Sequence, residues 1–263
     1  MPEFVKTSLA GRIAIVTIDR PELHNAFNEV VIDELTAAMR DSGDNVDVRV
    51  VVLRGEGRSF CAGADVHWMK RMVDYSFDEN VADATAMAEM LRAIRECPKP
   101  VIARVHGAAI GGGVGLVAAC DIAAAVRGVV FSLSEVKLGI LPAVISPYVM
   151  EKMGPGPMRR YALTAEKFDA GDAHRLGLVS HVAEDESGLD AWIDETARTL
   201  MGNGPEALAE CKRVLAAVQE KKSWDGKQRL TVKRISRRRV SSEGQDGLKA
   251  FLEKRKPGWT VEA

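Results

Sequence analysis

The chain has 263 residues, and its 46% hydrophobic content is enough to bury one sizeable core with room for a smaller appendage. A formal net charge of −1 gives no general attraction to nucleic acid or to an anionic membrane surface. No apolar run approaches eighteen residues, no signal-peptide pattern opens the chain, and the four cysteines lack C-x-x-C spacing, so we expect a cytosolic protein with reduced thiols.

Strands and helices alternate through the first part of the chain. Its β-branched density predicts a strand at Arg12–Asp19. Asn28 is the expected N-cap of a helix that continues to about Arg40, because apolar residues recur at helical spacing after it. The further predicted elements are strands at Val48–Leu53, Val101–Val105, Ile122–Val126 and Val129–Phe131, and helices at Ala82–Glu96 and Val114–Cys120.

From Ser146 onward the pattern is helical, and one short strand is predicted at Leu178–Val182. No linker rich in Ser, Gly or Pro separates the two parts. We therefore expect the helical tail to pack on the first part or on a neighbouring subunit. The repeated strand-strand-helix units indicate an α/β spiral.

Three consecutive glycines, Gly111–Gly113, stand between a predicted strand and a predicted helix. Glycine lets the chain turn sharply and lets a ligand approach the backbone closely. A helix that begins there leaves its first N–H groups unpaired, with the positive end of its dipole at the same place. This pattern is typical of an anion site or an oxyanion hole. A glycine turn that only permits tight helix packing is the alternative interpretation.

A second glycine-rich turn, within Leu53–Asp65, also joins a predicted strand to a helix. Two such junctions can each direct one backbone N–H at the same oxygen atom. In this order and at this separation, the pair resembles the enoyl-CoA hydratase/isomerase family, also called the crotonase family. Further matching motifs cover nearly the whole chain: Arg20-Pro21 with Asn25-Ala26, Lys99-Pro100-Val101, Cys120-Asp121-Ile122, Phe131 with Glu135-Val136 and Leu138-Gly139, and Phe251 with Lys254-Arg255-Lys256-Pro257 and Trp259.

The resemblance implies an α/β fold, a crotonase-like spiral of strand-strand-helix turns with a C-terminal helical trimerisation region. It divides the chain into a spiral core that holds the active site, residues 1–190, and a helical region, residues 191–263. It also implies a homotrimer, or a hexamer made of two trimers. The expected ligand is an acyl-CoA substrate, and no cofactor is expected because coenzyme A is part of that substrate.

The resemblance also implies how the two turns act. Carried over by position, the backbone N–H groups of Ala64 and Gly112 hold the thioester oxygen, which lowers the barrier to forming an enolate. Neighbouring turn residues are predicted to line the substrate site: Ala62, Gly63, Asp65 and Gly111.

Hydratases of the family carry two glutamates, and only one of them has a counterpart here. Glu135 matches the second glutamate, whereas Gly115 occupies the position of the first. A single carboxylate can still accept and return a proton, which suits double-bond isomerisation as well as hydration. An exposed carboxylate at a strand end is the structural alternative for Glu135.

Gly115 and the segment Ala143–Tyr148 indicate a narrower branch of the family. Together they resemble bacterial hydratases that act on 3-methylglutaconyl-CoA and isohexenylglutaconyl-CoA, from leucine and acyclic-terpene breakdown. We expect the missing side chain at Gly115 to make room for a branched, carboxylated acyl group. Hydroxyls of Ser134, Ser146 and Tyr148 are candidate ligands for the water or the free carboxylate, with turn and packing roles as the alternative.

Signals for other chemistry are weak. The chain lacks a complete G-x-G-x-x-G motif, a phosphate-binding G-x-x-x-x-G-K-[ST] motif and a G-x-S-x-G motif, and its histidines share no metal-ligand spacing. Lys227–Arg239 holds seven basic residues among thirteen, which leaves a non-enzymatic relative that binds RNA or CoA as an alternative. We favour a solvated or subunit-contacting helix there. The sequence therefore predicts a hydratase acting on a 2-enoyl-CoA, with a Δ3–Δ2 enoyl-CoA isomerase as the second hypothesis.

Overall fold

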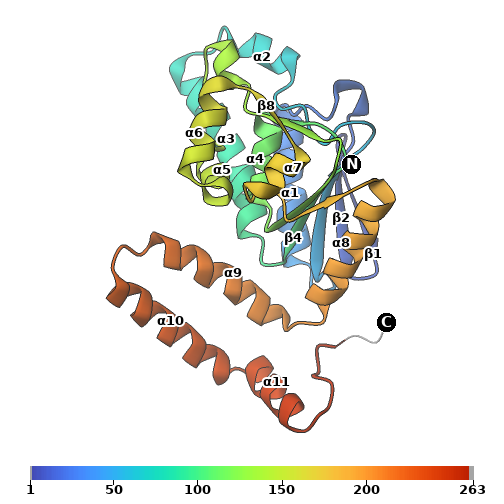
Figure 1. The fold of residues 1–263 in the computed structure, drawn as a ribbon, viewed down its shortest axis with the longest axis vertical. Helices are drawn as coiled ribbons and strands as arrows, with labels where there is room; N and C mark the ends of the chain where they lie inside the picture. Colours follow the sequence, from blue (N-terminus) through green and yellow to red (C-terminus); the bar gives the residue numbers. More distant parts are fainter. Residues whose placement is uncertain (1, 261–263) are drawn as a thin grey trace.

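The computed structural model describes residues 2–260, and its main sheet has six strands in the order β1-β2-β3-β4-β6-β9 (Figure 1). β1 is antiparallel to β2, and every other neighbouring pair in this sheet is parallel. The strands are β1 (Val5–Ala10), β2 (Ile13–Ile18), β3 (Val50–Gly55), β4 (Val101–Val105), β6 (Ile122–Val126) and β9 (His181–Ala183).

A smaller sheet contains β5 (Ala109–Ile110), β7 (Val130–Ser132) and β8 (Lys167–Asp169), in the order β5-β7-β8. β5 is parallel to β7, and an isolated bridge places Cys61 beside Ala109. Successive turns of the chain therefore give one strand to the main sheet, one short strand or bridge to the smaller sheet, and then a helix. This arrangement confirms the predicted spiral of strand-strand-helix units.

The helices divide between the two faces of the main sheet and a separate C-terminal arm (Figure 1). On one face α3 packs against both α1 and α4, and α8 covers the other face. The helical segments are α1 (Glu29–Asp44), α2 (Val66–Met72), α3 (Phe77–Glu96), α4 (Gly112–Ala119), α5 (Ser146–Met153), α6 (Pro155–Thr164), α7 (Ala170–Arg175), α8 (Glu186–Met201), α9 (Pro205–Glu220), α10 (Trp224–Arg239) and α11 (Ser242–Leu252), with single 3-10 turns η1 (Pro21–Leu23) and η2 (Glu135–Leu138).

Alternation along the strands explains the two-sided packing of the sheet. On β3, Val51 and Leu53 face the main core, whereas Val50 and Val52 belong to a second cluster with Leu189 of α8. Since both faces are covered, the parallel strands consist almost entirely of apolar residues. The domain boundary that we predicted after residue 190 falls inside α8, and the chain leaves the core only after this helix.

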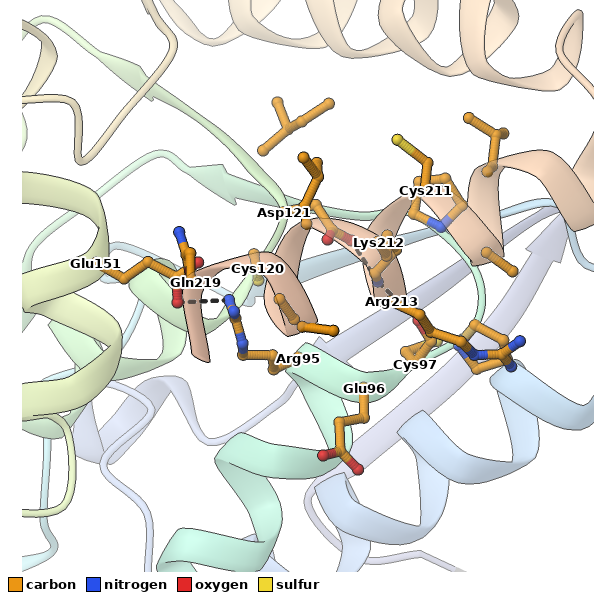
Figure 2. Close-up of a pocket in the computed structure, with 18 of the residues that line it drawn as sticks. Arg95, Glu96, Cys97, Cys120, Asp121, Glu151, Cys211, Lys212, Arg213 and Gln219 are labelled. Carbon is orange, nitrogen blue, oxygen red and sulfur yellow. Dashed lines mark hydrogen bonds and ion pairs between the residues drawn. The ribbon is translucent and has the colours of Figure 1, made fainter. Parts of the chain in front are cut away.

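α9, α10 and α11 form an arm beside the core (Figure 1). Lys212 fastens α9 to the core: its Nζ donates to the Cys97 carbonyl at 2.7 Å, to the Lys99 carbonyl at 2.9 Å and to Asp121 Oδ2 at 2.6 Å. A cleft of about 1090 Å³ lies around this contact, between α9 and the core, as Figure 2 shows. Among the described residues that line it, none belongs to the predicted catalytic site.

Several local predictions are confirmed, and others need correction. Asn28 caps α1 by accepting from the Val31 N–H at 3.1 Å. The sequence missed β1, which pairs with β2, and it placed the start of α3 at Ala82 although a capping box of Ser76 and Glu79 begins the helix at Phe77. Over residues 2–260, no helix is long and apolar enough to cross a membrane. All four cysteines are free, and three of them are buried.

Candidate active site

The Ala64 N–H lies on the free side of a backbone bridge. Phe27 pairs with Ala64, because the Phe27 N–H donates to the Gly63 carbonyl at 2.8 Å and the Asp65 N–H donates to the Phe27 carbonyl at 2.9 Å. These two bonds use the groups on either side of Ala64 and turn its own N–H away from Phe27. Within residues 2–260 no acceptor takes the Ala64 N–H.

The second free N–H belongs to Gly112, the first residue of α4. Gly111 adopts φ +53°, a left-handed conformation that favours glycine, and its N–H donates to the Ser132 carbonyl at 2.8 Å. The Gly112 N–H then has no partner among the described residues, as expected for the first turn of a helix. The sequence placed the start of this helix at Val114; the structure moves it to Gly112, so the dipole begins at the predicted donor.

The two turns lie directly against each other. A Cβ added to Gly63 would lie 2.8 Å from the Ile110 carbonyl oxygen and 3.7 Å from the Gly112 nitrogen. A Cβ on Gly112 would lie 2.3 Å from Phe27 Cζ and 3.1 Å from Met87 Cε. Only glycine permits this approach, and the structure therefore places both predicted donors at one location.

Glu135 stands beside these donors. It begins η2 just after β7, and a Cβ on Gly111 would lie 3.2 Å from Glu135 Oε1. Its Oε2 is buried and has no hydrogen-bond partner among the described residues. Burial raises the pKa of this carboxyl, and a hydrogen bond from its own backbone N–H opposes that effect. A carboxylate with a raised pKa and a free oxygen is equipped to accept and return a proton.

The space that we expected beside Gly115 is filled. A Cβ on Gly115 would lie 2.3 Å from Ile145 Cγ2 and 2.8 Å from Ile145 Cβ, with Leu91 Cδ2 at 3.7 Å. Ile145 is 1% exposed, so its side chain occupies the place that a side chain at position 115 would need. The hypothesis that the missing side chain makes room for a branched acyl group is therefore wrong, because Ile145 has taken the room.

Asp65 also differs from its prediction as a substrate-lining residue. Its Oδ2 accepts from Arg20 Nη2 at 2.9 Å, and its Oδ1 accepts from the His67 N–H at 2.6 Å and caps α2. Burial acts to raise the pKa of this carboxyl, but the hydrogen bonds from His67 and Arg20 outweigh it and hold the pKa low. Asp65 is 4% exposed, and it shapes the turn from inside. Ala62 donates its N–H to the His24 carbonyl at 3.0 Å and is half-buried.

The three candidate hydroxyls are spread over different surroundings. Ser134 precedes Glu135 at the start of η2 and is half-buried. Ser146 Oγ donates to the Ala143 carbonyl at 2.8 Å, which is a turn role. Tyr148 lies among charged side chains of α3, including Arg95, and burial raises the pKa of its phenol. Of these three residues, Ser134 is the one that directly precedes Glu135 in the sequence.

Sequence reasoning missed the apolar wall of the site. Phe27, Met87 and Leu91 contact the Gly111–Gly115 turn, and Ile145 closes it. The ring of Phe27 packs edge-on against buried Trp68 at a centroid distance of 6.1 Å. Met87 and Leu91 lie on the helix predicted at Ala82–Glu96, but the sequence gave no sign of what they face. In the described part of the chain, no group of three or more His, Cys, Asp or Glu side chains could hold a metal ion.

Comparison with known proteins agrees with this geometry. The sequence profile described as enoyl-CoA hydratase/isomerase matches residues 9–262. The chain belongs to the enoyl-CoA hydratase/isomerase family. A solved enoyl-CoA hydratase from Shewanella pealeana is 40% identical with a TM-score of 0.95, and the match covers 98% of this chain and 96% of that one.

Two further similar proteins also match nearly the whole chain. The structure of AtuE from Pseudomonas aeruginosa is 33% identical with a TM-score of 0.93 and matches 98% of this chain and 100% of its own. A peroxisomal Δ(3,5)-Δ(2,4)-dienoyl-CoA isomerase from Arabidopsis thaliana is 31% identical over 97% of this chain and 95% of its own length. Hydratases and isomerases thus both stand among the relatives, and an acyl-CoA substrate is consistent with this family.

Proposed function

We propose that this protein adds water to the double bond of a 2-enoyl-CoA thioester, with Glu135 as its acid and base. The observation that carries the proposal is the buried Oε2 of Glu135 beside two backbone N–H groups, all three without a hydrogen-bond partner within residues 2–260. The Ala64 and Gly112 N–H groups hold the thioester oxygen as negative charge develops on it. Glu135 accepts a proton from water while the water oxygen adds to carbon 3 of the substrate, and Glu135 then returns the proton to carbon 2. One carboxylate serves both steps, because Gly115 supplies no second one.

The acyl group that we propose is of the 3-methylglutaconyl type, and one of the two sequence features that favoured it no longer supports it. It rests on the Ala143–Tyr148 segment, since Ile145 has filled the place beside Gly115. The side chains nearest Gly112 and Gly115 are apolar, which suits a plain acyl chain equally well. Rates for 3-methylglutaconyl-CoA and crotonyl-CoA, measured in parallel, decide between the two substrates. A kcat/KM that favours crotonyl-CoA would overturn the branch assignment and keep the hydratase.

Δ3–Δ2 isomerisation is a second candidate, and Ile145 favours it. In place of a second carboxylate across from Glu135, the site has an apolar side chain, so no second group there can orient a water. A single carboxylate suffices to move a proton between carbons 4 and 2 of an enolate. Product analysis with 3-hexenoyl-CoA and crotonyl-CoA separates the two reactions.

The test of the proposed chemistry is Glu135→Gln, with Glu220→Gln as a control that removes an exposed charge on α9. We expect turnover of the first variant to fall by roughly 10²–10⁴, while CoA binding and the melting temperature stay unchanged. Near wild-type turnover would show that the proton is handled elsewhere. We further propose that neither metal nor nicotinamide takes part; loss of activity with EDTA, restored by a divalent ion, would contradict this.

We also propose that the α9–α11 arm joins copies of the chain into a trimer or a hexamer in the cytosol. In support, the arm carries apolar side chains that the single chain leaves exposed. Exposed apolar surface of this extent is typical of an interface. The residues are Leu215, Trp224, Val232, Ile235, Leu248, Phe251 and Leu252. Sedimentation equilibrium measures the mass, and a monomer at micromolar concentration would refute the proposal.

A further inference from the structure

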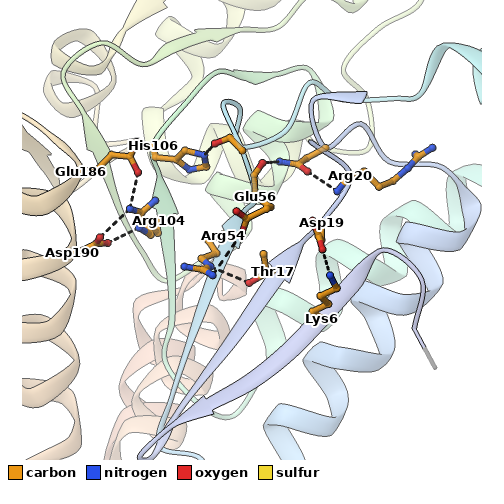
Figure 3. Close-up of polar contacts among 12 residues, drawn as sticks. Lys6, Thr17, Asp19, Arg20, Arg54, Glu56, Arg104, His106, Glu186 and Asp190 are labelled. Carbon is orange, nitrogen blue, oxygen red and sulfur yellow. Dashed lines mark hydrogen bonds and ion pairs between the residues drawn. The ribbon is translucent and has the colours of Figure 1, made fainter. Parts of the chain in front are cut away.

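The guanidinium group of Arg20 contacts both backbone segments of the Phe27–Ala64 bridge, which carries the Ala64 N–H. Arg20 lies at the end of β2 (Figure 3), where its Nη1 donates to the Ala26 carbonyl at 2.8 Å and its Nη2 donates to Asp65 Oδ2 at 2.9 Å. Ala26 precedes Phe27, and Asp65 follows Ala64. The same side chain therefore holds the two residues that flank the Phe27–Ala64 bridge on opposite strands.

The surroundings fix Arg20 itself. Its backbone N–H donates to Asn25 Oδ1 at 2.9 Å, and its guanidinium carbon lies 4.5 Å from the centroid of the Phe4 ring. Arg20 is 6% exposed and Asp65 is 4% exposed, so solvent screens the pair little. The guanidinium has one defined position from which to act on the bridge.

We propose that Arg20 is a positioning residue for the oxyanion hole, which aligns the Ala64 N–H and neutralises the Asp65 carboxylate next to it. The second role matters because the thioester oxygen gains negative charge beside Ala64. An unpaired buried carboxylate one residue away would oppose that charge and weaken the hole. With Arg20 in place, the turn presents the N–H without a competing anion.

A purely stabilising role explains the pair less well. A buried ion pair gains little stability over apolar residues of the same size, since both charges lose their hydration. Arg20 Nε is also buried and finds no acceptor in the described part of the chain, which adds to the cost. The fork geometry is specific, however: it joins a carbonyl and a carboxylate on two different segments.

This inference rests on the proposed function, and its test separates the two. The probe is 4-(dimethylamino)cinnamoyl-CoA, a conjugated thioester whose absorption moves to longer wavelength when its carbonyl oxygen is polarised. We expect the wild-type enzyme to shift this absorption on binding. We expect Arg20→Met to lose most of the shift and roughly 10²-fold in kcat, with a smaller change in KM, because a displaced donor acts chiefly on the transition state.

Two further variants distinguish alignment from charge. Arg20→Lys keeps a positive charge without the fork, so it should recover part of the shift. Arg20→Met combined with Asp65→Asn removes the unpaired carboxylate, so it should regain part of the kcat that Arg20→Met alone loses. If Arg20→Met does not fold, Arg20→Lys decides the matter, because loss of the fork should lower its shift and its kcat below those of the wild type.

Arg104→Met is the matched control. Arg104 is 9% exposed and pairs with Asp190 and Glu186 of α8 (Figure 3), away from the glycine turns. It should lose stability and keep both the shift and the kcat of folded enzyme. The proposal is overturned if the Arg20 variants keep the wild-type shift and kcat, or lose activity only in proportion to unfolded protein, as Arg104→Met does. A wild-type enzyme that binds the probe without a shift would instead overturn the oxyanion hole, and this proposal with it.

Discussion

Gly115→Glu tests whether Ile145 has replaced the missing side chain. The new Cβ would lie 2.3 Å from Ile145 Cγ2 and 2.8 Å from Ile145 Cβ, well inside van der Waals contact. Overpacking of a core costs about 1–3 kcal/mol. A buried carboxylate without a partner adds several kcal/mol. We therefore expect the free energy of unfolding to fall by about 4 kcal/mol or more, a large part of the 5–15 kcal/mol that typical domains have.

Urea unfolding at a fixed protein concentration, followed by circular dichroism, measures this loss. Gly128→Glu is the matched control, because an added Cβ there meets nothing within 4 Å. Its effect should stay within about 0.5 kcal/mol. Ile145→Gly in the Gly115→Glu background removes both clashing atoms. The pair should then be less destabilised than the sum of the single changes, by about 0.5–3 kcal/mol.

Equal midpoints for Gly115→Glu and Gly128→Glu would refute this reasoning, because they would show that Ile145 yields without cost. The double variant also has a chemical readout. It adds a second carboxylate at the position of the family's first glutamate, so its ratio of hydration to isomerisation should rise above the wild-type ratio.

Three further outcomes follow from the described contacts. Glu135 must be ionised to accept a proton, and burial raises its pKa above the ordinary 4.5. We therefore expect kcat/KM to fall as the pH is lowered through this raised pKa. A pH profile of kcat/KM that stays flat down to pH 4.5 would contradict this expectation. Lys212→Met removes the donor shared by the Cys97 and Lys99 carbonyls and leaves Asp121 Oδ2 with the Val101 N–H. It should lower the free energy of unfolding by about 1–3 kcal/mol, whereas exposed Lys221→Met should cause no change, as thermal melts would show. Exposed Cys211 should react quickly with a disulfide reagent, and the three buried cysteines should react only after unfolding. Burial raises the pKa of the Cys61 thiol, for example, to about 12. A second fast-reacting thiol would contradict the burial of these three cysteines.

What the sequence predicted well depends on neighbours along the chain. The glycine turn before α4 could be recognised from Gly111–Gly113 alone, whereas the choice of Gly112 as a donor came from family resemblance. Asn28 predicts the start of α1 through a capping preference that operates within three residues. The two glycine turns could be recognised separately for the same reason. Their contact, which brings Gly63 beside Gly112, was expected from family resemblance.

The errors concern contacts between distant segments. Gly115 shows a missing side chain, but only the fold reveals that Ile145, thirty residues later, enters the same space. Asp65 stands in a turn where a polar side chain often binds a ligand. In the structure, however, Arg20 reaches it from the end of β2 and donates a hydrogen bond to its Oδ2. β1 was missed because all of its residues except Val5 are exposed, so it lacks the dense apolar pattern of the central strands.

Because both proposed oxyanion donors are peptide N–H groups, a side-chain scan would misjudge them. Ala64 is already alanine, and Gly112→Ala would fail through collision with Phe27, so a scan would record it as a packing position. Replacement of either amide by an ester, through α-hydroxy acid incorporation, removes the donor and leaves the side chain intact. Residue-by-residue substitution would therefore point to Glu135 alone, although the proposed oxyanion hole is built from the main chain.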